Sequence, residues 1–388
     1  MTLAIVNVGE SHDGSLSGRP IAGDAVVVDG ATIAWIGSSS EIAHDDHEVI
    51  VDAAGATLIP GLIDSHVHST FGDYTPRQQT VGFLESYVHG GTTSVISASE
   101  VHIPGRPRDV AGVKALAVAA QRSFLDYRPG GMTVHAGSVI LEPGLTREDF
   151  AELRGLGVRL AKGGFGAFVD ARDYIPVVAD ARSEGIIVMC HSGGASIAGS
   201  KSKIDGDLLI EMAPDVAGHI NGGPTSLTME ENRRIVAEGR GIALQLVQAG
   251  NLRSAIDIAE RALEIGDLHR LLIATDTPTG TGVIPLGMLR SMAELASLGP
   301  LSPAEVVTAS TGNVAAVYGL ESGAIVVGAP ADLVVLDAPM GCSAGSAFGA
   351  LELGDIPSVA VVVTQGDIRV NRSRNTPPPM RDVTCRIK

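Results

Sequence analysis

The chain has 388 residues, of which 45% are hydrophobic, 3% aromatic and 19% charged, and its formal net charge is −16. This composition excludes a disordered chain and is typical of a globular protein whose core is filled by Ala, Val, Ile and Leu. The acidic balance argues against nucleic acid and anionic membranes as partners, because both bind clustered lysines and arginines, but it allows an anionic small substrate held by local arginines.

The first 57 residues read as short strands separated by turns. Examples are TLAIVNV, DAVVVDGATIAWIG and HEVIVDA, and Asp29-Gly30 fits a hairpin turn. The pattern does not switch to helical periodicity, so we expect a small β-rich unit here.

Between residues 58 and 320, eight apolar runs each precede a helical stretch or a long connection. Buried parallel strands read as continuous apolar runs because both faces of the sheet are covered. Eight strand–helix units in this length are what a (β/α)8 barrel, the TIM barrel, requires. The alternative, a doubly wound sheet, is weaker because no GxGxxG fingerprint follows the first run. The runs are TLIPGLID, TTSVISA, TVHAGSVI, VRLAKGG, IIVMCHS, VAGHI, IALQLV and LLIATD.

Strand patterns return after residue 320, in GAIVVG, ADLVVLD and SVAVVVTQGDIRV. Neither terminal segment alone has enough strands to bury a core. We therefore predict an α/β fold in which residues 1–57 and 321–388 form one composite β-sandwich domain and residues 58–320 form the barrel.

Ionisable residues stand where several predicted barrel strands end, which is where such barrels carry their function. His66 and His68 end the first strand, and residues i and i+2 of a strand point to the same face. Imidazole and carboxylate are common ligands of divalent metals, so we predict a metal site at this end of the barrel. The other ionisable strand ends are Lys162, His191, His219 and Asp276, on strands four, five, six and eight.

Each position also has an ordinary structural interpretation. His191 and His219 could be hydrogen-bonded core residues, Asp276 could cap a turn before Thr277, and Lys162 could pair with a carboxylate. The metal site is favoured because all these positions converge on one end of one barrel.

The combined motif resembles the amidohydrolase superfamily of metal-dependent hydrolases, over essentially the full chain. The resemblance is carried by HVH after PGLID, by the residues on strands four, five, six and eight, and by GAIVVGAPADLVVLD downstream. Within the superfamily, GDYTPRQ, GGTTSVISA, IPGRP, HINGGPT, IPLGMLR, TGNVAAVYGL and SRNTPP resemble the enamidase family. This implies hydrolysis of a cyclic amide, as enamidases open 6-oxo-tetrahydronicotinate to 2-formylglutarate and ammonia, and it implies a homotetramer.

The resemblance also implies two divalent cations, Zn first, with Fe or Mn as alternatives. His66, His68 and Asp276 are expected to hold one cation, and His191 with His219 the other. Enamidases have a bridging glutamate where this chain has Lys162. Many other amidohydrolases place a lysine there and convert it with CO2 into a carbamate, which is necessary if Lys162 bridges, because an ammonium group cannot ligate.

The expected reaction is hydrolysis of a C–N bond by a metal-activated hydroxide, formed because a shared water has its pKa lowered towards ~7. Asp276 is expected to take the proton from that water and pass it to the leaving nitrogen, as general base and then general acid. Lys162 keeps open a dihydroorotase-like or hydantoinase-like hydrolase of a cyclic imide or ureide. A non-catalytic barrel scaffold is a remote alternative, because it predicts missing ligands.

Four further residues are candidates for binding the substrate. Arg77 and Arg106 lie in loops after the first and second strands, and a guanidinium can hold a substrate carboxylate. The alternative for each is a solvent-exposed loop arginine. Tyr74 and Asn221 could form hydrogen bonds from neighbouring strand ends. The expected partner is therefore a small cyclic amide that carries a carboxylate.

Cys190, Cys342 and Cys385 are odd in number and widely spaced, which fits free thiols in a reducing cytoplasm. The N-terminus shows no signal-peptide pattern, and no apolar run approaches the ~18 residues of a membrane span. We therefore expect a cytoplasmic protein.

Overall fold

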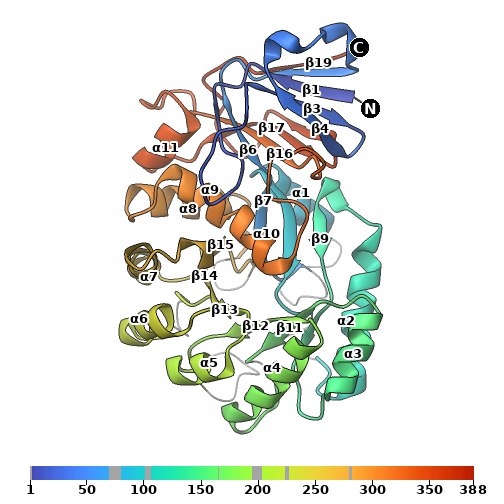
Figure 1. The fold of residues 1–388 in the computed structure, drawn as a ribbon, viewed down its shortest axis with the longest axis vertical. Helices are drawn as coiled ribbons and strands as arrows, with labels where there is room; N and C mark the ends of the chain where they lie inside the picture. Colours follow the sequence, from blue (N-terminus) through green and yellow to red (C-terminus); the bar gives the residue numbers. More distant parts are fainter. Residues whose placement is uncertain are drawn as a thin grey trace.

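A computed structural model describes residues 2–69, 80–100, 106–164, 166–194, 203–222, 227–278 and 282–388 of the chain. Strands and helices alternate through the middle of the sequence, and strands dominate its two ends (Figure 1). The N- and C-termini lie in the same β-rich part, beside the barrel (Figure 1).

The β-rich part contains two five-stranded sheets, each built from both ends of the sequence. Apolar side chains of the two sheets share one core, which includes Leu3, Val51, Leu58 and Val361. The first sheet, in the order β19-β5-β1-β3-β4, consists of β1 (Thr2–Val6), β3 (Ala25–Asp29), β4 (Thr32–Gly37), β5 (Val49–Asp52) and β19 (Thr384–Ile387). The second, in the order β18-β17-β16-β6-β2, consists of β2 (Glu10–Ser11), β6 (Thr57–Pro60), β16 (Leu333–Asp337), β17 (Ser358–Thr364) and β18 (Asp367–Asn371).

The barrel wall consists of parallel strands in two hydrogen-bonded groups. A bridge between Val67 and Thr277 joins the end of the last strand to the end of the first. The first group is β7 (Leu62–Val67), β8 (Thr92–Ser97) and β9 (Thr133–His135). The second group is β10 (Ser138–Ile140), β11 (Leu160–Gly163), β12 (Ile187–His191), β13 (Val216–Gly218), β14 (Ala243–Val247) and β15 (Leu271–Ala274).

The predicted barrel and sandwich are confirmed, although two of the eight predicted runs are divided. Run 57–64 gives β6 in the sandwich and β7 in the barrel. Gly61 separates them, and a Cβ there would lie 2.1 Å from Thr93 Oγ1, so only glycine fits. The third run breaks at Gly137 (φ +95°), whose N–H donates to the buried carboxylate of Glu100 (2.6 Å). The domain boundaries at residues 57 and 320 stay a prediction.

Helices cover the outside of the barrel, and their apolar faces pack on the strands in the largest core cluster. Local sequence defines several helix starts: Asp109 caps α2, and Thr228 with Glu231 forms a capping box on α6. These helices are α1 (Thr80–Val88), α2 (Val110–Leu125), α3 (Arg147–Gly155), α4 (Tyr174–Ser183), α5 (Gly206–Met212), α6 (Met229–Glu238), α7 (Leu252–Glu264) and α8 (Gly287–Ser297).

The N-terminal end of the barrel is closed by α10 (Gly312–Tyr318), whose Val314 and Tyr318 pack against the first inward residues of the strands, such as Ile63 and Leu160. Because this end is plugged, the opposite end is the open one. α9 (Pro303–Ala309) and α11 (Ala347–Leu353) pack beside α8. Short 3-10 turns occur at Ser39–Glu41, His44–Asp46, Pro129–Gly131, Ala171–Asp173 and Leu268–Arg270. Among the described residues, no helix has the length and apolar character needed to cross a bilayer.

Candidate metal centre

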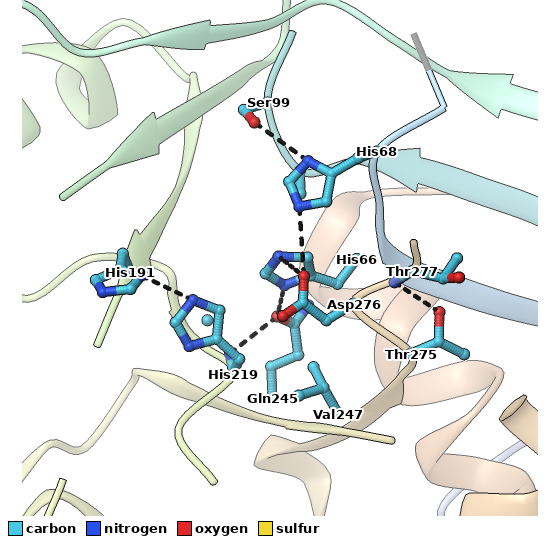
Figure 2. Close-up of polar contacts among 12 residues, drawn as sticks. His66, His68, Ser99, His191, His219, Gln245, Val247, Thr275, Asp276 and Thr277 are labelled. Atoms are coloured by element: carbon cyan, nitrogen blue, oxygen red, sulfur yellow. Dashed lines mark hydrogen bonds and ion pairs between the residues drawn. The ribbon is translucent and has the colours of Figure 1, made fainter. Parts of the chain in front are cut away.

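Five of the predicted ligands lie together at the C-terminal ends of the barrel strands (Figure 2). His66 and His68 come from β7, His191 from β12, His219 from the residue after β13, and Asp276 from the segment after β15. The four histidines are buried, and the side chain of Asp276 is 15% exposed. The open end of the barrel therefore carries a buried cluster of imidazoles beside one carboxylate.

His66, His68 and Asp276 form the tightest group. Nε2 of His66 and Nε2 of His68 each lie 3.3 Å from Oδ1 of Asp276, and the potential ligand atoms of the three residues lie within 4.8 Å of one another. Backbone bonds between the first and last strand ends fix this arrangement, because Asp276 N donates to His66 O (3.0 Å) and His68 N donates to Thr277 O (2.8 Å).

His191 and His219 form a second group next to the first. Nδ1 of His191 lies 2.9 Å from Nε2 of His219, and the His219 ring lies 5.4 Å from that of His66. His219 (φ +39°) and Asp276 (φ +59°) both have left-handed backbone conformations. Such conformations cost on the order of 1–3 kcal/mol for a residue other than glycine and cluster at functional sites.

Polar side chains behind the histidines orient them. Oε1 of Gln245, on β14, lies 2.6 Å from Nδ1 of His66, so His66 donates through Nδ1 and presents the lone pair of Nε2 towards Asp276. Asp64, on β7, accepts hydrogen bonds from the N–H of His66 (3.2 Å) and the hydroxyl of Thr275 (2.5 Å), and burial raises its pKa to about 7. The sequence analysis missed Gln245 and Asp64, although each interrupts an apolar strand.

Lys162 lies on β11 with 1% of its surface exposed, and burial lowers its pKa. Two glycines follow it and allow β11 to approach β12. A Cβ on Gly163 would lie 2.4 Å from Sγ of Cys190, and one on Gly164 (φ +91°) would lie 2.6 Å from Cβ of His191. The AKGG sequence therefore lets β11 pack closely on β12, where Lys162 lies opposite Met189 and on the same face of the sheet as His191.

The donor set fits divalent cations. Burial lowers the pKa of all four histidines, and the nearby charge of Lys162 lowers it further, to about 3 for His68 and His191. Neutral imidazoles keep the lone pairs that metals bind. Imidazoles combined with a carboxylate are a ligand set that Zn, Fe and Mn accept. The residues able to hold metal are His66, His68, His191, His219 and Asp276.

The predicted substrate contacts have different outcomes. Tyr74 and Arg77 lie outside the described residues. Arg106 is buried, and its Nη2 lies 3.1 Å from Oε1 of Glu142, so it is not a solvent-exposed loop arginine. The amide of Asn221 joins two strand ends, because its Nδ2 donates to Val247 O (3.0 Å) and its Oδ1 accepts from Val247 N (2.8 Å). A substrate role for each of these residues stays a prediction.

Comparison with known proteins gives the chain full-length relatives. A model described as the amidohydrolase family matches residues 57–369. Enamidase of Eubacterium barkeri is 45% identical over 378 residues, which are 97% of each chain. Imidazolonepropionase of Salinispora arenicola is 26% identical over 377 residues, covering 87% of this chain and 93% of that protein.

Solved structures give the same result. A crystal structure of enamidase, described as a new member of the amidohydrolase superfamily, superposes with a TM-score of 0.93 at 43% identity and covers 100% of both chains. D-hydantoinase from Thermus sp. superposes with a TM-score of 0.63 at 19% identity and covers 96% of each chain, which shows a common fold.

Proposed function

The chain belongs to the amidohydrolase family, and from this premise we propose that it hydrolyses the C–N bond of a cyclic amide, as an enamidase does. The observation that carries the proposal is the convergence of His66, His68, His191, His219 and Asp276 at the open end of the barrel, in a chain 45% identical to an enamidase. Burying four histidines costs stability unless their polar atoms are compensated, and binding of metal for catalysis provides that compensation.

We assign one cation to His66, His68 and Asp276 and the other to His191 and His219. The support is the 3.3 Å approach of two Nε2 atoms to one Asp276 oxygen and the 2.9 Å approach of the second pair. Cations held there would supply an acidified water and a Lewis acid for the amide carbonyl. Zn is the first expectation, with Fe or Mn as alternatives.

Lys162 is proposed to bridge the cations as its carbamate. Its burial lowers the pKa of the ammonium group, and the neutral amine that this favours is the form that reacts with CO2. The carbamate would provide two oxygens from β11, the strand next to β12, which carries His191. This assignment also suits hydrolases of cyclic imides, so it supports the reaction class more strongly than it selects a substrate.

Asp276 is proposed to move the proton. Its carboxylate lies between the two β7 histidines and retains 15% exposure, so it can face both water and substrate. Burial raises the pKa of this carboxyl, which suits a group that accepts a proton at one oxygen and returns it to the leaving ring nitrogen.

The proposed substrate is a carboxylate-bearing lactam of the 6-oxo-tetrahydronicotinate type. One water adds at the lactam carbonyl and breaks its bond to nitrogen. A second water replaces the resulting amine at the enamine carbon, which leaves an aldehyde and releases ammonia. A cyclic imide or ureide would be opened by the first step alone, without loss of ammonia.

The test is a substrate panel on one metal-analysed preparation: 6-oxo-tetrahydronicotinate, dihydroorotate and hydantoin, with ring opening and ammonia measured separately. We expect ammonia release with the first compound. Ring opening of dihydroorotate or hydantoin alone would replace the enamidase proposal with the cyclic imide alternative. His191→Ala should lower both bound metal and turnover, and an unchanged turnover would contradict the two-cation scheme.

Two further proposals concern the setting of the enzyme. The three cysteines are free, which supports a reducing compartment such as the cytoplasm. A homotetramer is proposed from the resemblance to enamidase, and light scattering of the purified protein would test it.

A further inference from the structure

A cavity of about 270 Å³ lies near the closed end of the barrel, away from the metal centre. It lies between β9 and β11, where the barrel wall lacks a direct strand pairing in the described ranges of the chain; we call this gap the seam. β9 pairs with β8, whereas β11 pairs with β10 only from Leu160 onwards, so residues 133–136 have no strand partner on this side among the described residues. α2 covers the seam from outside, on the same side of the barrel as β9 (Figure 1).

The lining combines apolar walls with polar atoms that lack partners. Ile96, Phe124, Val134, Leu160 and Leu320 provide the apolar surface. The unpartnered buried atoms are Gln121 Oε1, Thr133 Oγ1, His135 Nε2 and Tyr318 Oη. Tyr318 is only 5% exposed, so its hydroxyl can reach neither bulk water nor a protein acceptor. Leaving a buried polar atom without a hydrogen-bond partner is unfavourable, so several such atoms around one cavity indicate that a polar molecule fills it.

The rim of the cavity is positively charged. Arg128 and Arg159 both line it and are exposed, and neither forms an ion pair within the part of the chain that the structure describes. Two unpaired arginines at one mouth are notable in a chain with a net charge of −16. Arg128 and Arg159 also line an adjoining hollow that contains two carboxylates, Asp332 and Glu321. Burial raises the pKa of Asp332, and the charge of Arg128 counteracts this rise. An anion would therefore be favoured on the opposite side of the arginines, which faces α2.

We propose that this seam cavity is a second binding site, distinct from the metal centre, for a small organic anion with a compact apolar body. The anionic group lies between Arg128 and Arg159 at the mouth. The body lies against Phe124, Val134 and Leu160, and a polar substituent reaches Tyr318. The volume suits such a ligand, because a cavity of about 150 Å³ already accommodates benzene.

The site is connected to the metal centre through one strand. Leu160 and Lys162 are two residues apart on β11, so their side chains point to the same face, with Leu160 lining the seam cavity and Lys162 among the histidines. A ligand bound in the cavity would therefore lie one layer of barrel side chains away from the metal centre. The proposal does not depend on the reaction catalysed there.

The test uses 4-bromobenzoate as the probe, on the intact metal-loaded enzyme. Titration calorimetry measures its affinity, and the anomalous signal of bromine in a soaked crystal locates it. We expect a bromine peak between α2 and β9, and at least tenfold weaker binding of the neutral isostere 4-bromobenzamide. A peak confined to the metal centre, or no binding at millimolar probe, would overturn the proposal.

Substitutions in the cavity provide a second test of the proposed site. The double variant Arg128→Gln/Arg159→Gln should weaken 4-bromobenzoate binding at least tenfold, and Tyr318→Phe should weaken binding of the 3-hydroxy analogue relative to the parent probe. Arg122→Gln is the matched control, because Arg122 is an exposed arginine on α2 that does not line the cavity. Equal affinities in wild type and the double variant would overturn the proposal, because the probe would then bind without the two arginines.

Discussion

Gln245 and His66 lie far apart in sequence, yet Oε1 of Gln245 is 2.6 Å from Nδ1 of His66. The same amide donates through Nε2 to the backbone carbonyl of Ser65 (3.1 Å), which can only accept, and this fixes which end of the amide faces the histidine. This bond sets the tautomer of His66 and leaves Nε2 for the metal. Partners of this kind fix the tautomer and the orientation of a metal-binding histidine.

Replacing Gln245 with Leu removes the acceptor while keeping a similar volume. We expect metal affinity to fall by roughly 10- to 100-fold, the range typical of lost partners of metal-binding histidines. The measurement is competition with a chelator, followed by elemental analysis. Gln245→Glu keeps an acceptor for His66 and should retain most of the affinity. A Leu variant that binds metal as tightly as wild type would contradict this role.

Gly164→Ala should disturb His191 specifically. The added methyl group would lie 2.6 Å from Cβ of His191 at a backbone φ of +91°, so the strand ends must separate. We expect at least a tenfold loss of turnover, together with a lower metal content per chain. Gly155→Ala is the matched control, because a Cβ there meets nothing within 4 Å. If the two alanine variants are equally active, the close contact does not position His191.

Much of this site could be predicted from the sequence because apolar runs mark the strands and ionisable residues mark their ends. His191 and His219 each follow such a run directly. The interactions across the barrel could not be predicted, because Gln245 and Asp64 lie inside strands and their partners lie on other strands. The Arg106–Glu142 pair was hidden because it joins two loops that are distant in sequence. The seam could not be predicted because the third apolar run reads as one continuous strand. The run is interrupted at Gly137, whose N–H donates to the carboxylate of Glu100, a residue distant in sequence.

The state of Lys162 can be tested by two substitutions of opposite effect. Lys162→Gln cannot form a carbamate and should lose bridged metal, with turnover reduced by at least a hundredfold. Lys162→Glu supplies a carboxylate directly and should retain measurable activity that is independent of dissolved CO2. Native mass spectrometry of wild type should show the added mass of one CO2, which Lys162→Gln lacks. Equal activity of wild type with and without CO2 during metal loading would contradict the carbamate.

His12 lies away from the metal centre, and it should make the free energy of unfolding depend on pH. Nδ1 of His12 accepts the N–H of Gly14 (2.9 Å), and burial lowers its pKa from 6.5 against the opposing effect of Asp13. Below about pH 6.5 the unfolded chain therefore binds a proton that the folded chain excludes. The free energy of unfolding should fall as the pH drops from 6.5 towards the folded pKa, and it should be fully retained above 6.5.

The measurement is urea unfolding of wild type and His12→Asn at about pH 7.5 and about pH 5.5, compared as a difference so that the other histidines cancel. His12→Asn keeps an acceptor for Gly14 and should lose less stability on acidification than wild type. His269→Asn, at an exposed histidine, should behave as wild type. If His12→Asn and wild type lose the same stability over this range, then protonation of His12 does not destabilise the fold, and the acid sensitivity comes from other groups, such as His135, whose pKa burial also lowers.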